Sequence, residues 1–131
     1  MLNKKLSIIS VLMNNQETLV KMKESVERQT FKDYEHIFCI SKKSTDKTNE
    51  ILIKKIKDSD KIIYEKKTTK NKFDAINQAL NFSKGKFIFL LHGDDYLANK
   101  NFFANIFREI DKNNNKCIFY TDINIVNSKG E

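Results

Sequence analysis

Two neighbouring carboxylates, Asp94 and Asp95, follow a run of five apolar residues, Phe87–Leu91. Such an uninterrupted run is typical of a strand buried on both faces, because a half-exposed strand alternates apolar and polar residues. In an open sheet of parallel strands, ligands bind just beyond the carboxyl ends of the strands. Adjacent carboxylates repel each other unless a cation offsets their charge, and Mg²⁺ and Mn²⁺ prefer oxygen ligands from carboxylates and phosphates. The pair therefore predicts a divalent metal site at Asp94 and Asp95.

The same residues also have a simpler interpretation. The sequence His92-Gly93-Asp94-Asp95 is ordinary turn chemistry, because glycine adopts unusual backbone angles and aspartate side chains bind nearby backbone groups. Taken alone, the acidic pair does not distinguish a turn from a site. The elements that would position it provide the next test.

Strand and helix patterns alternate along the whole chain. Apolar or β-branched runs predict strands at Leu6–Leu12, His36–Ile40, Lys61–Tyr64, Phe87–Leu91 and Cys117–Val126. Helical spacing of apolar residues predicts helices at Gln16–Arg28, after Ser44-Thr45-Asp46, at Phe73–Phe82 and around Phe102–Ile110. This alternation predicts an α/β fold with a mainly parallel sheet covered by helices on both faces.

Length and charge limit the class of protein. A chain of 131 residues forms one domain, and its net charge of +7 comes almost entirely from lysine, with Arg28 and Arg108 as the only arginines. Because base recognition depends on arginine and on aromatic residues among basic ones, we expect no nucleic-acid partner. Clustered lysines such as Lys42-Lys43 are interpreted as solvated; attraction to anionic lipid, at about 1 kcal/mol per lysine, stays open as a peripheral membrane association.

Targeting and cysteine patterns give two further expectations. No apolar run approaches the roughly 20 residues that cross a bilayer, and no signal-peptide core is present at the amino terminus, so we expect a soluble cytoplasmic protein. Cys39 and Cys117 lie in predicted strands and are expected to be buried free thiols. No cysteine and histidine spacing typical of zinc occurs.

Five segments, in order, carry a resemblance to a known family. The chain resembles the nucleotide-binding half of the family 2 glycosyltransferases, which have the GT-A fold, from about Lys5 to Gly130. The segments that carry it are Ser10–Asn15 after the first strand, Glu24–Phe31, Ser41–Thr48 after the second strand, Phe73–Asn77, and Leu91–Leu97 with the acidic pair. Each is weak alone, but their order and spacing match the family.

The resemblance implies a fold and a chemistry. It implies a Rossmann-like, three-layer α/β/α fold, with residues 1–131 as a single nucleotide-sugar-binding domain that lacks the acceptor-side half. The implied reaction is transfer of a sugar from a nucleotide-diphosphate donor to a glycan or lipid-linked acceptor, with Mn²⁺ or Mg²⁺ as cofactor. The implied setting is bacterial surface polysaccharide or glycoconjugate synthesis, in the cytoplasm or at the inner face of the membrane.

The resemblance also assigns candidate site residues. Asp94 and Asp95 would form the DXD-like metal motif. The nucleotide-sugar site would comprise Met13, Asn14, Glu17, Ser41, Asp74, Asn77, Gly93 and Asp94. No catalytic base is assigned, because in inverting members of the family this carboxylate comes from the second half. Simpler roles stay open for Asp74, as an acid at a helix start, and for Asn77, as a solvated amide.

Three departures from the family pattern leave a second interpretation open. Ser41 stands where the family has an aspartate, Met13 replaces a tyrosine that stacks on the base, and His92 replaces the first acid of the acidic motif. Each change weakens one part of donor recognition. The alternative to a glycosyltransferase is therefore a module of the same fold that binds a nucleotide without catalysis or serves as a protein-interaction surface.

Overall fold

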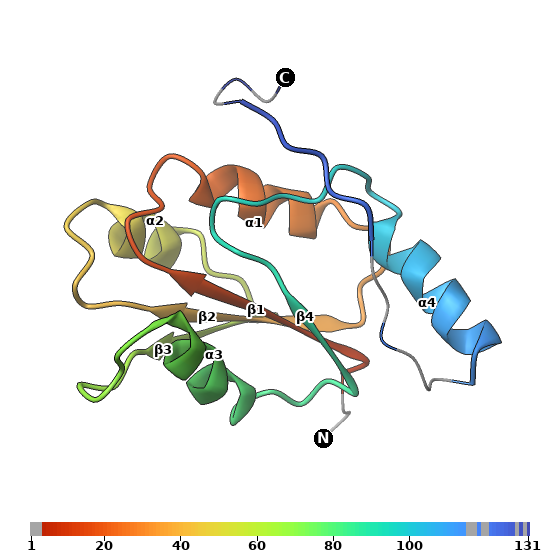
Figure 1. Cartoon of the computed structure of the whole chain (residues 1–131), viewed down its shortest axis with the longest axis horizontal. Coiled ribbons are helices and arrows are strands. Elements are labelled where there is room, and N and C mark those ends of the chain that lie inside the picture. Colours follow the sequence, from red (N-terminus) through yellow and green to blue (C-terminus); the bar gives the residue numbers. More distant parts are fainter. Residues whose placement is uncertain (1–3, 115–117, 119–120, 128, 130) are drawn as a thin grey trace.

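A single parallel sheet forms the centre of the protein. The computed structural model describes residues 4–114, 118, 121–127, 129 and 131. The strands are parallel and lie in the order β3-β2-β1-β4 (Figure 1), with bounds β1 Leu6–Leu12, β2 Tyr34–Ile40, β3 Asp60–Tyr64 and β4 Phe87–Leu90. The helices are α1 Leu19–Glu27, α2 Thr48–Lys54, α3 Lys72–Leu80 and α4 Phe102–Lys112. The prediction of an α/β fold with a mainly parallel sheet is confirmed.

The larger core lies on the sheet face covered by α1, α2 and α4. Leu12 of β1 and Phe38 of β2 are fully buried there among apolar side chains of these three helices: Leu19, Met22, Val26, Leu52, Phe103, Phe107 and Ile110. Alternation along each strand puts every second residue on this face. The helical spacing of the apolar residues therefore matches the sheet that they cover.

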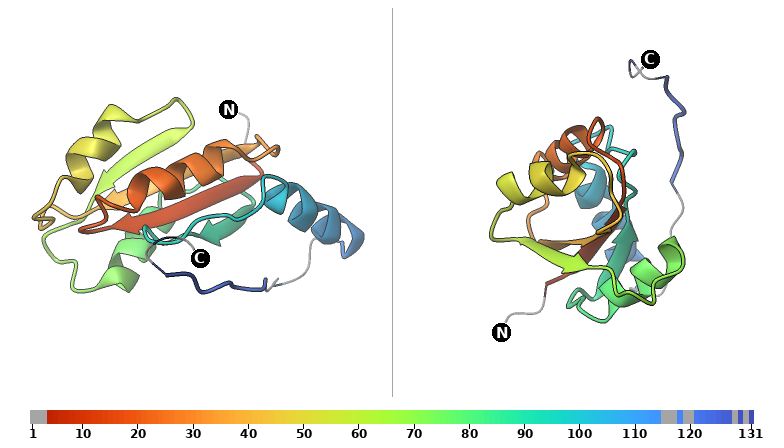
Figure 2. Two further views of the ribbon diagram at one scale, coloured as in Figure 1. Left: turned by 90° about the horizontal axis from the view of Figure 1, so that it is seen from above. Right: turned by 90° about the vertical axis from the view of Figure 1, so that its left-hand side faces the viewer.

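A smaller core lies on the opposite face, under α3. Ala75 and Ala79, one turn apart, pack on Ile9, Ile37 and Cys39 of β1 and β2. Their small side chains let the helix approach the sheet closely. Together the two cores give three layers, with α3 on one side of the sheet and the other helices on the opposite side (Figure 2).

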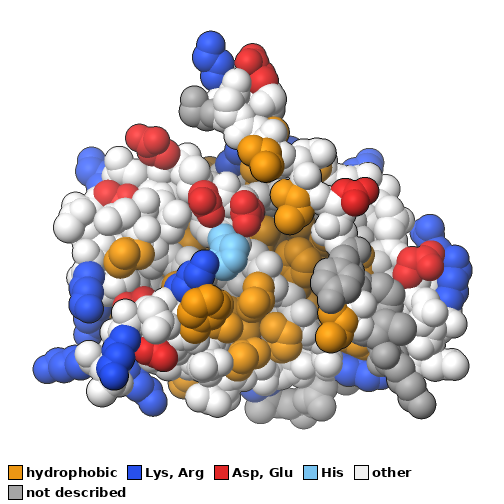
Figure 3. Space-filling model, viewed as in Figure 1, with side chains coloured by type: hydrophobic (Ala, Val, Ile, Leu, Met, Phe, Trp, Pro, Cys, Tyr) orange, Lys and Arg blue, Asp and Glu red, His pale blue; other side chains and the backbone are white. Residues whose placement is uncertain are grey.

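Strand β4 is not buried on both faces, and that prediction is wrong. Phe89 packs on the larger core, whereas Ile88 and Leu90 point to the other face and are 42% and 46% exposed. The physical reason is that β4 is an edge strand, paired only with β1 among the described strands, while α3 packs mainly on β1 and β2. Figure 3, drawn in the same view as Figure 1, shows hydrophobic side chains gathered on this face of the molecule.

The predicted strand over Cys117–Val126 does not form in the residues that the structure describes. Ile118 and residues 121–127 have no strand conformation and are exposed. A strand needs a hydrogen-bonded neighbour, and none of the described strands pairs with this segment. Cys117 lies outside the described residues, whereas Cys39 is buried and free as predicted. None of the helices described here is long and apolar enough to cross a membrane.

Candidate functional site

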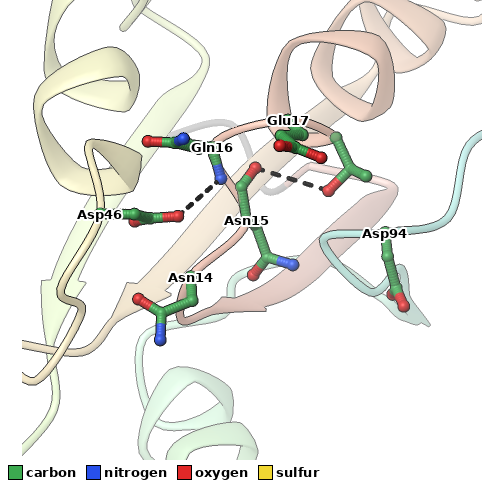
Figure 4. Close-up of a pocket in the computed structure, with 7 residues that line it drawn as sticks. Asn14, Asn15, Gln16, Glu17, Asp46 and Asp94 are labelled. Carbon is green, nitrogen blue, oxygen red and sulfur yellow. Dashed lines mark hydrogen bonds between the residues drawn. The ribbon is translucent and has the colours of Figure 1, made fainter.

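A polar hollow opens where the strands β1, β2 and β4 end. Its volume is about 350 Å³, and its lining comes from the loop after β1, one residue after β2 and one after β4: Asn14, Asn15, Gln16, Glu17, Thr18, Asp46 and Asp94. In the close-up, Asp46 and Asp94 lie on opposite sides of the loop after β1 (Figure 4). The carboxyl ends of parallel strands are the usual ligand-binding edge of such sheets.

The loop after β1 is fixed by hydrogen bonds to the loop after β2. Asn14 has a backbone φ of 55°, a left-handed conformation that asparagine tolerates better than most residues. Its Oδ1 atom accepts a hydrogen bond from the Thr45 N–H at 2.8 Å, and its own N–H donates to the Ser44 Oγ at 3.2 Å. The Asn15 N–H donates to the Thr48 Oγ1 at 2.7 Å. One wall of the hollow is therefore a rigid pair of loops.

Asp46 joins the same two loops through one carboxylate oxygen and binds the start of α2 through the other. Oδ2 accepts from the Gln16 N–H at 3.0 Å (Figure 4). Oδ1 accepts from the Thr48 N–H at 2.9 Å. Desolvation opposes ionisation, but hydrogen bonds from Thr48 and Gln16 outweigh it and lower the pKa of the Asp46 carboxyl. Asp46 is thus an ionised cross-link that shapes the hollow and adds negative charge to it.

The acidic segment after β4 is both a turn and a part of the hollow. The Asp95 N–H donates to the His92 carbonyl at 3.1 Å, which is the turn that the simpler interpretation expected. Gly93 is buried, and a Cβ atom there would lie 2.6 Å from Leu12 Cδ2 and 2.7 Å from Asn15 Cγ. Both acids are exposed, and Asp94 lines the hollow. The turn therefore presents a carboxylate to the site.

The residues present fit a divalent cation only in combination with a ligand that brings its own oxygens. Within the described part of the chain, no group of three or more His, Cys, Asp or Glu side chains is placed to hold a metal ion. Mg²⁺ is commonly held by one or two carboxylates together with phosphate oxygens and water. Asp94 and Asp95 can supply the carboxylates, so the remaining ligands would have to come from phosphates and water.

Besides Asp94, two residues predicted to bind the nucleotide sugar line the hollow, namely Asn14 and Glu17. Met13 is exposed and is not part of the lining. Ser41 is fully buried beneath the loop; its Oγ accepts from the Lys43 N–H at 3.1 Å. The Ser41 hydroxyl is therefore engaged within its own loop.

Asp74 and Asn77 lie on α3 and are not part of this lining. Asn71 is the N-cap of the helix, and its side chain accepts from the N–H groups of Phe73 at 2.9 Å and Asp74 at 3.1 Å. The Asp74 carboxylate in turn accepts from the Lys70 N–H at 2.8 Å. This arrangement agrees with the open alternative of an acid at a helix start, where the helix dipole favours negative charge.

Sequence reasoning missed four residues of the hollow, which are Asn15, Gln16, Thr18 and Asp46. Three of them flank the predicted positions Asn14 and Glu17, so their place after the first strand could have found them. Asp46 lies in the Ser44-Thr45-Asp46 segment that was expected to precede a helix, and it was not assigned to the site. Asp46 also lies in the Ser41–Thr48 segment that carries the family resemblance, but its place in the hollow depends on contacts between two loops that are 30 residues apart in the chain.

The geometry of this hollow can be compared with known proteins. Residues 7–128 match the model of the family described as glycosyl transferase family 2. The chain belongs to this family. This confirms the resemblance drawn from the five segments.

Two relatives of this family 2 chain are glucosyltransferases. The chain is 41% identical over 90 residues to UDP-Glc:alpha-D-GlcNAc-diphosphoundecaprenol beta-1,3-glucosyltransferase WfaP of Escherichia coli, a match that covers 69% of this chain and 35% of the relative. It is 28% identical over 100 residues to the poly(ribitol-phosphate) beta-glucosyltransferase of Bacillus spizizenii, covering 73% of this chain and 16% of the relative. The chain therefore spans about a third or less of these relatives.

Solved structures show the same GT-A fold. TarS 1-349 of S. aureus matches with a TM-score of 0.73 and 25% identity, over 82% of this chain and 32% of TarS 1-349. The mannosyltransferase PcManGT of Pyrobaculum calidifontis, solved with GDP-Man and Mn²⁺, matches with a TM-score of 0.73 and 16% identity, over 84% of this chain and 33% of that one. The second likeness concerns the fold alone.

Proposed function

We propose that this family 2 chain is the donor-binding domain of a metal-dependent glycosyltransferase. The donor is a nucleotide-diphosphate sugar that binds in the hollow after β1, β2 and β4. The acceptor is a glycan or lipid-linked molecule of cell-surface polysaccharide or glycoconjugate synthesis, reached at the inner face of the membrane. The names of the two relatives support this class of reaction, since WfaP uses UDP-Glc and a diphosphoundecaprenol acceptor.

One observation carries the proposal: Asp94 lines a polar hollow at the carboxyl edge of the sheet. The volume of about 350 Å³ lies within the range of roughly 300–1,000 Å³ that is usual for small-molecule sites. The lining is rich in amide and carboxylate groups, which suit the hydroxyl groups of a ribose or sugar. A negatively charged diphosphate could not settle beside Asp94 without a cation between them.

The chemistry follows from the charges. A bound Mn²⁺ or Mg²⁺ supplies positive charge that offsets the charge building on the leaving diphosphate. Asp94 and Asp95 would hold this ion, while Asn14 and Glu17 would border the nucleotide. The rigid pair of loops after β1 and β2 would orient the donor. No residue of this chain is assigned as the general base, because the described hollow is the donor side alone.

Calorimetric titration of the chain with UDP, GDP and CDP, each with and without Mn²⁺, tests the proposal. We expect one nucleotide to bind at sub-millimolar concentration in the presence of Mn²⁺. Asp94→Asn should weaken this binding about tenfold or more, because interactions with an ionised group are stronger than those with a neutral one. Asp58→Asn, an exposed acid in the connection before β3, is the matched control and should leave affinity unchanged. Failure of all three nucleotides to bind at millimolar concentration would contradict the proposal.

A second candidate function is nucleotide binding without sugar transfer. It is favoured by Ser41, which is buried and bonded within its own loop at the position of the family's aspartate. A donor titration followed by a product assay separates the two. Binding of the nucleotide sugar with neither transfer nor hydrolysis by the full-length protein would favour the second candidate, whereas turnover would exclude it.

A further inference from the structure

The connection between β4 and α4 lies along one face of α1. Polar side chains of α1 and its two ends contact this connection. They are three or four residues apart in the sequence, which places them on the same side of the helix. We call these residues the α1 polar row: Thr18, Lys21, Ser25 and Gln29. Thr18 is the N-cap of α1, and Gln29 follows its C-cap, so the row runs the full length of the helix.

Each member of the row holds a successive part of the connection. The Gln29 amide donates to the Asn99 carbonyl at 2.7 Å, and the Ser25 hydroxyl accepts from the Leu97 N–H at 3.0 Å. Both side chains are buried. The connection is therefore anchored firmly at its α4 end.

Nearer the hollow, the contacts reach the acidic turn itself. The Lys21 ammonium lies 3.9 Å from the centre of the Tyr96 ring, directly after the acidic pair. The Thr18 hydroxyl donates to the Gly93 carbonyl at 2.7 Å. Thr18 is thus the member of the row that bonds the residue before Asp94, and it also lines the hollow.

The geometry leaves little freedom at this contact. A hydroxyl has one proton, and the Gly93 carbonyl is much closer to Thr18 Oγ1 than the Asn15 carbonyl, which lies at 3.4 Å. On its other side, Gly93 is packed against Leu12 and Asn15. The carbonyl of Gly93 is therefore held between the strand end and the helix start, and the direction in which Asp94 leaves the turn is fixed with it.

We propose that Thr18 is a positioning residue of the donor site, which aims Asp94 into the hollow by holding the Gly93 carbonyl. This rests on the proposed function insofar as Asp94 serves the donor. The contact itself exists without ligand, so its role can be tested separately. Thr18→Val removes the hydroxyl at nearly constant shape, and Thr18→Ser keeps it.

Hydrogen exchange of backbone amides in the ligand-free protein is the first readout. We expect Thr18→Val to speed exchange of the Asp95 amide, whose N–H donates to the His92 carbonyl across the turn, about three- to tenfold, while Thr18→Ser stays close to wild type. Ser83→Ala is the matched control, because the Ser83 hydroxyl also donates to a carbonyl at 2.7 Å, that of Leu80, away from the hollow. It should leave exchange of the Asp95 amide unchanged.

Affinity for the nucleotide that binds the wild type with Mn²⁺ is the second readout. Thr18→Val should weaken the Mn²⁺-dependent binding by a similar factor, and Thr18→Ser should restore it. Unchanged exchange at Asp95 in a folded Thr18→Val protein would overturn the inference. If the wild type binds no nucleotide, the proposed function fails, yet the exchange comparison still decides whether Thr18 positions the acidic turn.

A variant at an exposed member of the row provides a second test in case Thr18→Val does not fold. Lys21 is exposed, so Lys21→Met keeps the stem but removes the charge over the Tyr96 ring without disturbing the core. We expect a smaller acceleration of amide exchange at Asp95, about two- to fivefold. No acceleration in Lys21→Met, together with none in Thr18→Val, would mean that the row does not hold the turn.

Discussion

The Nε2 atom of His36 lies 2.9 Å from the Oγ of Ser10, and both side chains are fully buried between the sheet and α1. The imidazole also stacks on Phe38, with 3.9 Å between ring centres. Burial, and then the nearby charge of Lys23, lower the pKa of His36 to about 3. A neutral histidine is therefore built into the larger core.

This pair predicts a loss of stability in mild acid. Unfolded His36 binds a proton below its ordinary pKa of 6.5, whereas folded His36 does so only near pH 3. The unfolded state therefore binds more protons between these values, and the free energy of unfolding should fall by about 1 kcal/mol per pH unit as the pH drops from 6.5. Urea unfolding at pH 7, 6 and 5 measures this slope. An equal slope in His36→Gln would show that another group is responsible.

A buried ion pair joins α1 to β3. The Lys23 ammonium lies 2.7 Å from Asp60 Oδ2, and both side chains are 3% exposed. Lys23→Met should lower the free energy of unfolding by about 3–5 kcal/mol, because Asp60 would keep its charge without its partner. Lys54→Met, which breaks the exposed pair with Glu50 at the same distance, should change stability very little. Equal effects of the two variants in urea unfolding would contradict this account.

The close packing at Gly93 predicts a specific effect on ligand binding. Gly93→Ala places a Cβ atom against Leu12 and Asn15, which should cost about 1–3 kcal/mol of stability and shift the acidic turn. Gly85→Ala is the control, because its Cβ would meet the Ser7 backbone at the opposite end of the sheet. Both variants should melt at lower temperature, but only Gly93→Ala should weaken nucleotide binding in calorimetry. Equal nucleotide affinity in the two variants would contradict the role of this contact.

The two faces of β4 should respond differently to substitution. Phe89 packs on Phe102 and Phe103 with ring centres 5.6 Å and 5.2 Å away, so Phe89→Ala should cost about 3 kcal/mol. Leu90→Thr, on the exposed face, should cost less than about 1 kcal/mol, since its side chain already meets solvent. Chemical denaturation of both variants measures the difference, and a larger loss for Leu90→Thr would mean that this face is covered in solution.

The sequence predicted the succession of strands and helices along the chain better than it predicted which of their side chains are buried. Strand β1 was expected with its observed bounds, because Leu6–Leu12 is an apolar, β-branched run beside a clear helix pattern. The apolar run at β4 was misjudged, because apolar residues alone do not reveal whether a helix covers each face. Helix α3 packs mainly on β1 and β2, a fact of packing that no local pattern contains.

The candidate site was predictable where it depends on strand ends and unpredictable where it depends on loop contacts. Asn14 and Glu17 lie in the loop after β1, Asp94 lies in the turn after β4, and all three line the hollow. The roles of Asp46 and Thr18 arise from bonds to Gln16 and Gly93, which lie 30 and 75 residues away in the chain. Such contacts exist only once the sheet has brought the loops together.

Paramagnetic broadening by Mn²⁺ tests the central claim most directly, because it reports where a cation sits when the diphosphate is present. The described residues offer no cluster of three metal-binding side chains, so Mn²⁺ alone should bind weakly. With UDP, or whichever nucleoside diphosphate binds in calorimetry, Mn²⁺ should selectively broaden the amide resonances of residues 14–18 and 93–95, and Asp94→Asn should abolish the effect. Broadening that is the same without nucleotide, lies elsewhere on the surface, or survives in Asp94→Asn would contradict a cation-bridged donor at this edge of the sheet.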